Sequence, residues 1–438
     1  MKYPHGGKGK KMKFSWGHLG RDFWLFRSGQ VISVIGDSCG GVALAWWILD
    51  VTGSPAKMAS IIAPAMFVRI FLLPLFGPFG DKYSRKWIII IGDVWRGLMT
   101  LGLAAMVFFK VFNLPAVIAL YILNAAGSAL FASAANSIVP QLVPKEKLQT
   151  AMQQEQAIMG GGGVIGGIAG GLLVTVLGIY GAFIADAASY FIAAYASYKI
   201  KTDTTPASSD NTGAHSIKSW LGDIKSGFRV VIKIPFELWL AVVAAFLNFC
   251  IAPMFIALPV LVKQVRNMPP WFLGALESSI SVGSILGAVA VGWICRKIVT
   301  DKVVVFGVMI SGLGVAILPW IPNPALPLCM MFTIGFGVML ANIPLNTQMT
   351  LAMPDEYRAR TGSVTGFLSQ LALPLGTAFA GAMITGVGLN FTMLICGVAL
   401  IILSPALFLI PKFSELLRAS PEQAGNYYLE HYPEAFKK

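Results

Sequence analysis

Residues 77–86 read Gly77-Pro78-Phe79-Gly80-Asp81-Lys82-Tyr83-Ser84-Arg85-Lys86, and an apolar run of membrane-spanning length lies on each side of them. Charged side chains at this density are too costly to place in hydrocarbon. The glycines and the proline also interrupt a rigid helix. The segment is therefore predicted to be a short aqueous hairpin that joins two membrane spans.

The composition indicates a polytopic membrane protein. Hydrophobic residues make up 56% of the 438 positions and charged residues only 12%, against roughly 25% charged in a typical soluble domain. The first 21 residues are basic and contain no short apolar run that ends in a small-residue cleavage site. We therefore expect no signal peptide, and we expect the first span to stay in the membrane.

The net charge of +13 is distributed unevenly along the chain. With twelve spans and a cytoplasmic N-terminus, the outward loops hold only Lys57, Lys110, Lys263 and Arg266. Such an excess of basic residues on one side is the positive-inside pattern. It predicts a multi-pass protein of the cell membrane with both termini in the cytoplasm, and it accounts for the charge without nucleic-acid binding.

Twelve segments have the length of about 20 residues that a helical membrane span requires. The first six are 23–50, 55–79, 87–110, 114–138, 148–177 and 179–199, and the second six are 236–262, 271–295, 302–321, 325–350, 358–386 and 389–411. The expected fold is an all-α membrane protein with two pseudo-symmetric six-helix bundles. Its parts are an N-terminal segment (1–21), an N-terminal bundle (22–200), a cytoplasmic linker (201–235), a C-terminal bundle (236–411) and a cytoplasmic tail (412–438).

The linker and the loops support this division. Residues 201–215 have the composition of a flexible linker, and residues 217–233 form a basic amphipathic pattern typical of a helix on the inner membrane surface. The segment 140–148 before the fifth span corresponds to 354–363 before the eleventh, and Arg296-Lys297 mirrors Arg85-Lys86. Six-span repeats of this kind enclose a central cavity that opens to alternate sides as the halves rock.

The spacing Gly-x-x-x-Asp-Lys-x-Ser-Arg-Lys in the charged turn resembles the signature of the major facilitator superfamily, although Ser84 stands where that family usually has glycine. Further motifs, in order, are similar to the macrolide-efflux and enterobactin-exporter branch of its drug:proton antiporters. They are residues 46–55, Gly92-Asp93, the run 140–148 and residues 373–376. The resemblance covers about residues 22–411.

The resemblance implies a conformational latch at the charged turn. Asp81 and Arg85, with Gly77 and Lys86 of the same motif, would face the N-terminal end of the eleventh helix around residues 361–363, where a helix end attracts negative charge. Asp93 and Arg96 would support the turn. The alternative is that the basic residues only enforce topology.

The fifth span carries a run of glycines that resembles the antiporter motif of drug exporters, with Gly167 where those proteins have proline. The glycines concerned are Gly162, Gly166, Gly167, Gly170 and Gly171. Because glycine lets two helices approach closely, plain close packing is the alternative interpretation.

Ionisable residues inside spans are functional candidates, since burying a charge in the bilayer is costly. Asp37 and Arg69 differ in depth by only about 5 Å, which is close enough for them to pair. Asp37 is the first candidate for proton or cation binding, and a structural bridge to Arg69 is the alternative. Glu155, Asp186 and Glu277 are further candidates, the last two lying close enough to the outer surface to be hydrated.

A pocket for a bulky amphipathic compound would combine adaptable apolar surface with neutral amides. The candidates are Phe67, Asn124, Asn136, Asn248, Met254, Phe255, Asn342, Asn346, Gln348 and Gln370. The sequence has no phosphate-binding Gly-x-x-x-x-Gly-Lys-Ser/Thr loop and no metal-ligand or catalytic spacing. We therefore expect no cofactor, no metal and no enzymatic activity.

These patterns predict a monomeric secondary exporter of amphipathic, drug- or macrolide-like molecules, driven by proton antiport through alternating access. Its partners would be the substrate, protons and the lipid bilayer. Two alternatives on the same fold are a siderophore or lipid-like exporter, and a passive or metal-ion carrier in which Asp37 binds the cation.

Overall fold

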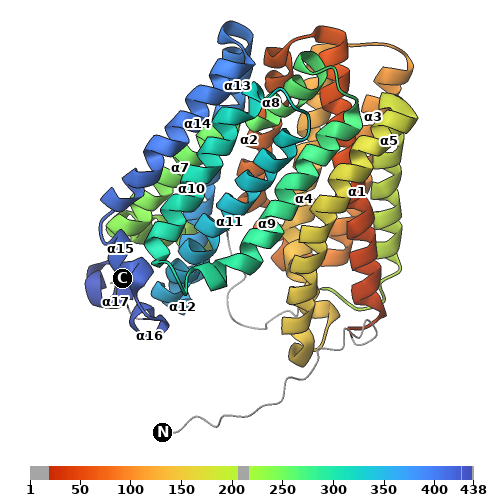
Figure 1. Cartoon of the computed structure of the whole chain (residues 1–438). Helices are drawn as coiled ribbons and strands as arrows, with labels where there is room; N and C mark the ends of the chain where they lie inside the picture. Colours follow the sequence, from red (N-terminus) through yellow and green to blue (C-terminus); the bar gives the residue numbers. More distant parts are fainter. Residues whose placement is uncertain (1–18, 206–216, 426, 437–438) are drawn as a thin grey trace, which may run out of the picture.

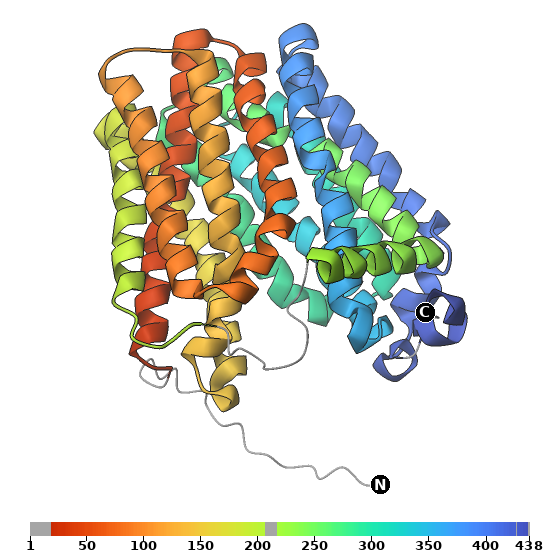
Figure 2. The same ribbon diagram turned by 180° about the vertical axis from the view of Figure 1, so that it is seen from behind.

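The computed structural model describes residues 19–205, 217–425 and 427–436, and in this part of the chain the secondary structure is helical (Figure 1). The N-terminal end of α1 lies at the same end of the molecule as the last helices of the chain (Figures 1 and 2). This end is called the terminal face, and the opposite end is called the far face.

The N-terminal bundle contains α1 (Arg21–Thr52), α2 (Pro55–Lys82), α3 (Arg85–Phe108), α4 (Leu114–Leu142) and α5 (Leu148–Tyr198), with the short turn η2 (Lys145–Lys147) before α5. The last of these is two spans, because the backbone turns at Gly178, where φ is +68°. Glycine adopts this left-handed conformation without steric cost. The break falls where the sequence predicts it, between spans 148–177 and 179–199.

Several spans of the C-terminal bundle are interrupted. One is built from α7 (Pro235–Ile251), α8 (Met254–Val260) and a π-helical turn η3 (Leu261–Val265), and another from α12 (Asp355–Gln370) and α13 (Ala372–Val387). The others are α9 (Pro270–Ile294), α10 (Thr300–Ile317) with η4 (Leu318–Trp320), α11 (Leu326–Ala352), and α14 (Leu389–Ala406) with η5 (Leu407–Leu409). The described residues include eleven apolar helical segments long enough to span a membrane. One of them, α5, is two spans joined at Gly178, which brings the total to twelve. The twelve-span prediction is thus confirmed.

The linker is anchored where it leaves the N-terminal bundle. Thr204 is 1% exposed, its hydroxyl lies 3.1 Å from Ser84 Oγ, and it accepts a hydrogen bond from the backbone N–H of Lys86 at 3.0 Å. The prediction of a flexible linker is therefore wrong for its first residues, because the charged turn offers polar partners. Residues 206–216 lie outside the described part. The helix α6 (Ile217–Lys233) then crosses the C-terminal bundle and packs on α12 (Figure 2).

The segment after η5 folds against the terminal face instead of extending as a tail. It forms α15 (Phe413–Arg418), α16 (Pro421–Ala424), α17 (Tyr427–His431) and η6 (Pro433–Ala435). The Tyr428 hydroxyl is buried and donates to Glu237 Oε1 at 2.9 Å. Burial, and then the neighbouring Glu237, raise the pKa of Tyr428 well above its ordinary value, so it stays a hydrogen-bond donor.

The two bundles meet closely where α5 packs on α9. A Cβ built on Gly274 would lie 2.0 Å from the carbonyl oxygen of Gly167, and one built on Gly171 would lie 2.8 Å from the carbonyl oxygen of Pro270. Only glycine permits this approach of two backbones. On another side of α5, Gly162, Gly166 and Gly170 face α1, so the glycine run serves two interfaces.

Replacing Gly274 with leucine should separate α5 from α9, because the new side chain has no space beside Gly167. We expect a loss of about 1–3 kcal/mol in the free energy of unfolding, measured by thermal unfolding in detergent. Gly292→Leu is the matched control on the same helix, since a Cβ there has no atom within 4 Å. Equal stability of the two variants would contradict this account of the interface.

Candidate functional site

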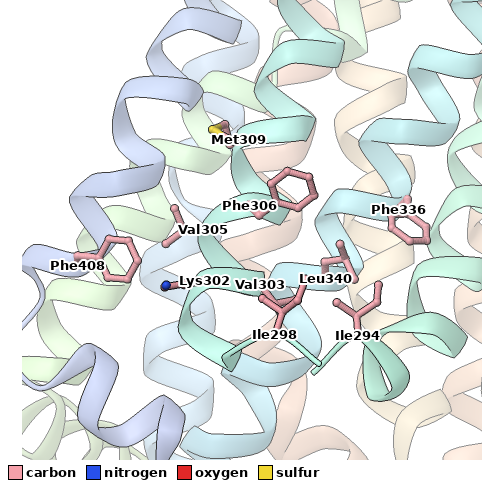
Figure 3. Close-up of a pocket in the computed structure, with 10 residues that line it drawn as sticks. All are labelled: Ile294, Ile298, Lys302, Val303, Val305, Phe306, Met309, Phe336, Leu340 and Phe408. Carbon is pink, nitrogen blue, oxygen red and sulfur yellow. The ribbon is translucent and has the colours of Figure 1, made fainter. Parts of the chain in front are cut away.

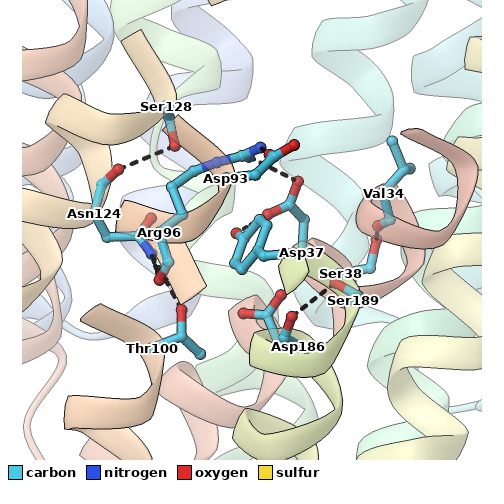
Figure 4. A network of polar contacts seen from close by, with 11 residues as sticks. Val34, Asp37, Ser38, Asp93, Arg96, Thr100, Asn124, Ser128, Asp186 and Ser189 are labelled. Carbon is cyan, nitrogen blue, oxygen red and sulfur yellow. Dashed lines mark hydrogen bonds and ion pairs between the residues drawn. The ribbon is translucent and has the colours of Figure 1, made fainter. Parts of the chain in front are cut away.

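A polar network in the N-terminal bundle joins α1, α3, α4 and α5 (Figure 4). Arg96 on α3 forms an ion pair with Asp93, one turn earlier on the same helix. Its second guanidinium nitrogen lies 3.8 Å from Asp37 Oδ2 on α1. The hydroxyl of Tyr190 on α5 donates a hydrogen bond to Asp37. A single guanidinium therefore serves two carboxylates.

Arg96 is held firmly by its surroundings. Its guanidinium carbon lies 4.4 Å from the ring centroid of Phe131 and 4.3 Å from that of Tyr190, a geometry that stabilises a cation between aromatic faces. Asn124 Nδ2 donates to Thr100 Oγ1 at 3.2 Å and to the backbone oxygen of Arg96 at 3.4 Å, which ties α4 to this part of α3.

Asp186 on α5 is the third acid in this region, and two glycines of α1 make room for it. A Cβ on Gly40 would lie 2.2 Å from Asp186 Oδ2, and one on Gly36 would lie 3.0 Å from Oδ1. Asp186 is only 5% exposed, and among the described residues its Oδ1 has no hydrogen-bond partner. In this structure α1 covers Asp186 and shields it from bulk solvent.

The charges of this network are unequal in number. If Asp37, Asp93 and Asp186 were all ionised, three negative charges would face the one positive charge of Arg96. Excess buried charge of this kind is expensive in a medium of low dielectric constant. The Asp37 side chain is 46% exposed, so among the three acids it is the one open to a ligand or water.

The predicted pair between Asp37 and Arg69 does not form. Arg69 on α2 is exposed and has no ion-pair partner among the described residues. The reason is the packing order: α1 lies along α5 and α5 along α3, whereas α2 packs on α4 and α13. The helix that faces Asp37 is therefore α3, and Arg96 takes the place expected for Arg69.

Two other predicted acids have different environments. Glu155 on α5 forms an ion pair with Arg27 of α1 at 2.7 Å, and Arg27 is 1% exposed. The sequence did not predict this pair, because Arg27 lies near the start of the first span. A basic residue there is usually explained by the orientation of the span in the membrane. Glu277 lies on the side of α9 opposite to most of its exposed apolar residues, among them Val282, Leu286, Val289 and Trp293. It points toward the interior of the protein.

The expected latch is only partly visible, because the side chain of Asp81 lies outside the described part. Arg85 Nη1 donates to the carbonyl oxygen of Ser137 and Lys86 Nζ to that of Ile200, both at 2.6 Å. These bonds satisfy carbonyl groups near the ends of α4 and α5. A Cβ on Gly77 or Gly362 would have no atom within 4 Å.

Asp93 and Arg96 do not support the charged turn as predicted. Since α3 begins at Arg85, they lie about 12 Å and about 16 Å along the helix from it. At this depth they belong to the network around Asp37. The signal for Tyr190, which the sequence analysis missed, is its position four residues after Asp186, on the same face of α5.

The predicted cavity residues fall into three groups. Met254 is 7% exposed in the core, and Gln348 Nε2 donates to the carbonyl oxygen of Ala419, so these two serve packing and the docked tail. Asn124 and Asn248 bridge helices within their own bundles, the latter by donating to the carbonyl oxygen of Ser369 at 2.9 Å. The exposed candidates are Phe255, Asn342, Asn346 and Gln370, together with the half-buried Phe67, whose ring stacks on Phe71. The side chain of Asn136 lies outside the described part.

The bundles are also joined at the far face. Lys263 Nζ on η3 forms an ion pair with Asp50 of α1 and donates to the carbonyl oxygen of Trp46 at 2.8 Å. Gln264 Nε2 donates to the carbonyl oxygen of Gly53 at 3.0 Å. A π-helical turn of one bundle thus caps the C-terminal end of α1 in the other. Sequence reasoning treated Lys263 only as a loop charge, since nothing in the sequence brings it to α1.

Two six-helix bundles that meet at the far face, with an acidic network inside one of them, define the architecture of a secondary transporter. The chain belongs to the Major Facilitator Superfamily, whose family model matches residues 28–377. The family predicted from the charged turn is confirmed, and the relatives below confirm its macrolide-efflux branch.

Two relatives are named for efflux. The chain is 26% identical over 388 residues to the multidrug efflux pump Tap of Mycolicibacterium fortuitum, and 20% identical over 388 residues to macrolide efflux protein A of Streptococcus pyogenes. Each alignment covers 86% of this chain and 93% of the relative. A bacterial homologue of the human lysosomal transporter Spinster, solved in an inward-facing and unoccupied conformation, matches with a TM-score of 0.74 and 16% identity, covering 93% of this chain and 100% of that one. At this identity the likeness shows the fold alone.

Replacing Lys263 with glutamine should favour opening of the far face, because Asp50 and the Trp46 carbonyl oxygen lose their shared cation. A charged hydrogen bond contributes about 1.5–3 kcal/mol, so the open population should rise about tenfold or more. Electron–electron double resonance between spin labels at the exposed positions Lys57 and Asn323 measures the opening. Lys110→Gln, a far-face lysine with no partner among the described residues, is the control. An unchanged distance distribution in K263Q would refute the role of this contact.

Proposed function

We propose that the protein is a secondary active exporter of amphipathic small molecules and that proton antiport drives it. Membership of the Major Facilitator Superfamily and the efflux names of its relatives support export. The observation that carries the coupling is the cluster of three carboxyl groups around one guanidinium, with only Asp37 open to its surroundings. Both termini would be cytoplasmic, as the distribution of basic residues indicates.

Competition at Asp37 would provide the coupling. When Asp37 is ionised, its exposed carboxylate can accept a further hydrogen bond from a substrate or attract a positively charged group of the substrate. When it is protonated, that interaction is lost. Binding of the proton and of the substrate then oppose each other, and the effect is reciprocal by thermodynamic linkage. Contacts such as the ion pair between Lys263 and Asp50 would keep the far face closed while the substrate enters from the terminal face.

The same machinery would suit a siderophore or a lipid-like compound, since the exposed amides and aromatic rings of the candidate cavity do not discriminate between these classes. A passive or metal-ion carrier would instead need several ligands around Asp37. Within the described part of the chain, no group of three or more His, Cys, Asp or Glu side chains is placed to hold a metal ion.

Replacing Asp37 with asparagine should abolish accumulation driven by a pH gradient, while exchange of substrate across the membrane continues. The substitution removes the titrating group but keeps a similar shape. The measurement is uptake of a radiolabelled macrolide, or of another ligand chosen by its thermal stabilisation of the purified protein, into proteoliposomes with an imposed gradient.

The control is Glu422→Gln, which removes one acid from the exposed part of α16. Gradient-driven accumulation by D37N at the wild-type level would refute proton coupling at this residue. Binding of a metal ion by the wild-type protein that is lost in D37N would indicate the cation-carrier alternative instead.

A further inference from the structure

An apolar groove lies on the outer surface of the C-terminal bundle, near the terminal face (Figure 3). Its floor is one face of α10, where Lys302, Val305, Phe306 and Met309 follow helical spacing. The end of α9, the side of α11 and Phe408 of η5 form its walls. Its volume of about 580 Å³ lies within the range of roughly 300–1,000 Å³ typical of small-molecule sites.

The groove opens outward, toward the region that hydrocarbon occupies in a membrane. Phe306 is 50% exposed and Phe408 is 44% exposed. Val303 and Leu340 at its base are buried, at 2% and 1%. A flat lipid-facing surface would need no such hollow, so the shape favours one bound chain over general contact with the bilayer.

Among the described residues that line the groove, Lys302 is the only charged one. The adjacent acid, Asp301, does not neutralise it, because Asp301 Oδ2 is engaged by Arg418 of the docked tail at 2.7 Å. Lys302 is exposed, and no described acid lies within ion-pair distance of it. Its ammonium group therefore stands uncompensated where the groove meets the terminal face.

Two further basic residues, Arg296 and Lys297, are exposed in the loop between α9 and α10. Lys297 Nζ lies 4.1 Å from the ring centroid of Trp293. In the corresponding turn of the N-terminal bundle, Arg85 and Lys86 donate to backbone carbonyl groups. No such acceptor is present for Arg296, Lys297 or Lys302 in the described residues, so this second basic turn is free to bind an anion.

We propose that this groove binds an anionic phospholipid, with one acyl chain along α10 and the phosphate head group against Lys302, Arg296 and Lys297. The occupant must be apolar over the length of the groove and negatively charged at one end, close to the membrane surface. An anionic lipid meets both requirements, and basic residues near a membrane surface attract such lipids. The site is separate from the acidic network of the N-terminal bundle, so the inference does not depend on proton coupling.

Native mass spectrometry of protein from nanodiscs with equal phosphatidylglycerol and phosphatidylcholine tests the proposal. The wild-type protein should retain one phosphatidylglycerol. The triple variant R296Q, K297Q and K302Q should retain at most about one tenth as much phosphatidylglycerol as the wild-type protein. The control triple K145Q, K199Q and K201Q removes the same charge from exposed terminal-face lysines of the other half and should retain the lipid.

Met309→Trp tests the apolar part, because the larger ring fills the groove while all charges remain. It should also lose the lipid, whereas Val289→Trp, at a 75% exposed position on α9 outside the groove, should keep it. Wild-type retention of both lipids alike, or unchanged retention in the triple variant and M309W, would overturn the proposal. Displacement of the lipid by a macrolide would do so too, because the occupant would then be the transported compound.

Discussion

The interior of the N-terminal bundle contains three acids, Asp37, Asp93 and Asp186, and a single guanidinium, that of Arg96, to compensate them. Arg96 is the guanidinium within reach of Asp37 and Asp93, and it lies between the rings of Phe131 and Tyr190 with only 5% of its side chain exposed. Every helix around it contributes either an acid, a ring or a hydrogen bond. Because charges in a poorly polarisable interior must be compensated, the contacts of Arg96 with Asp37 and Asp93, and of Tyr190 with Asp37, hold α1, α3 and α5 together.

The acids can be assembled in this way because glycine removes side chains from the helix surfaces. Gly36 and Gly40 of α1 leave the space that Asp186 fills, and Gly166 and Gly170 of α5 receive the turn of α1 that contains Ser38. Two neighbouring faces of α5, about 100° apart, thus contact α1 in its own bundle and α9 in the other. The helix α1 therefore contacts both spans of α5, the one that contains Asp186 and the one that packs on α9.

The sequence predicts the spans and the family because hydropathy and the charged turn are local properties of the chain. It also predicts the break at Gly178, since two apolar runs meet there. It does not predict the partner of Asp37, because Arg69 and Arg96 both lie at about the same depth in the membrane as Asp37. Only the packing of α1 on α5 decides between the two arginines. The docking of the tail cannot be predicted from the sequence for a similar reason. Tyr428 has no distinguishing feature in the sequence, and its partner Glu237 is brought to it only by the fold.

In the proposed mechanism, a proton held by the acid cluster competes with a substrate that binds at Asp37. Proton release on ligand binding tests this most directly, with a stabilising ligand added to purified protein in weakly buffered detergent solution. The wild-type protein should release about one proton per bound ligand. Ligand binding without any change in bound protons, measured over the pH range in which transport occurs, would contradict it.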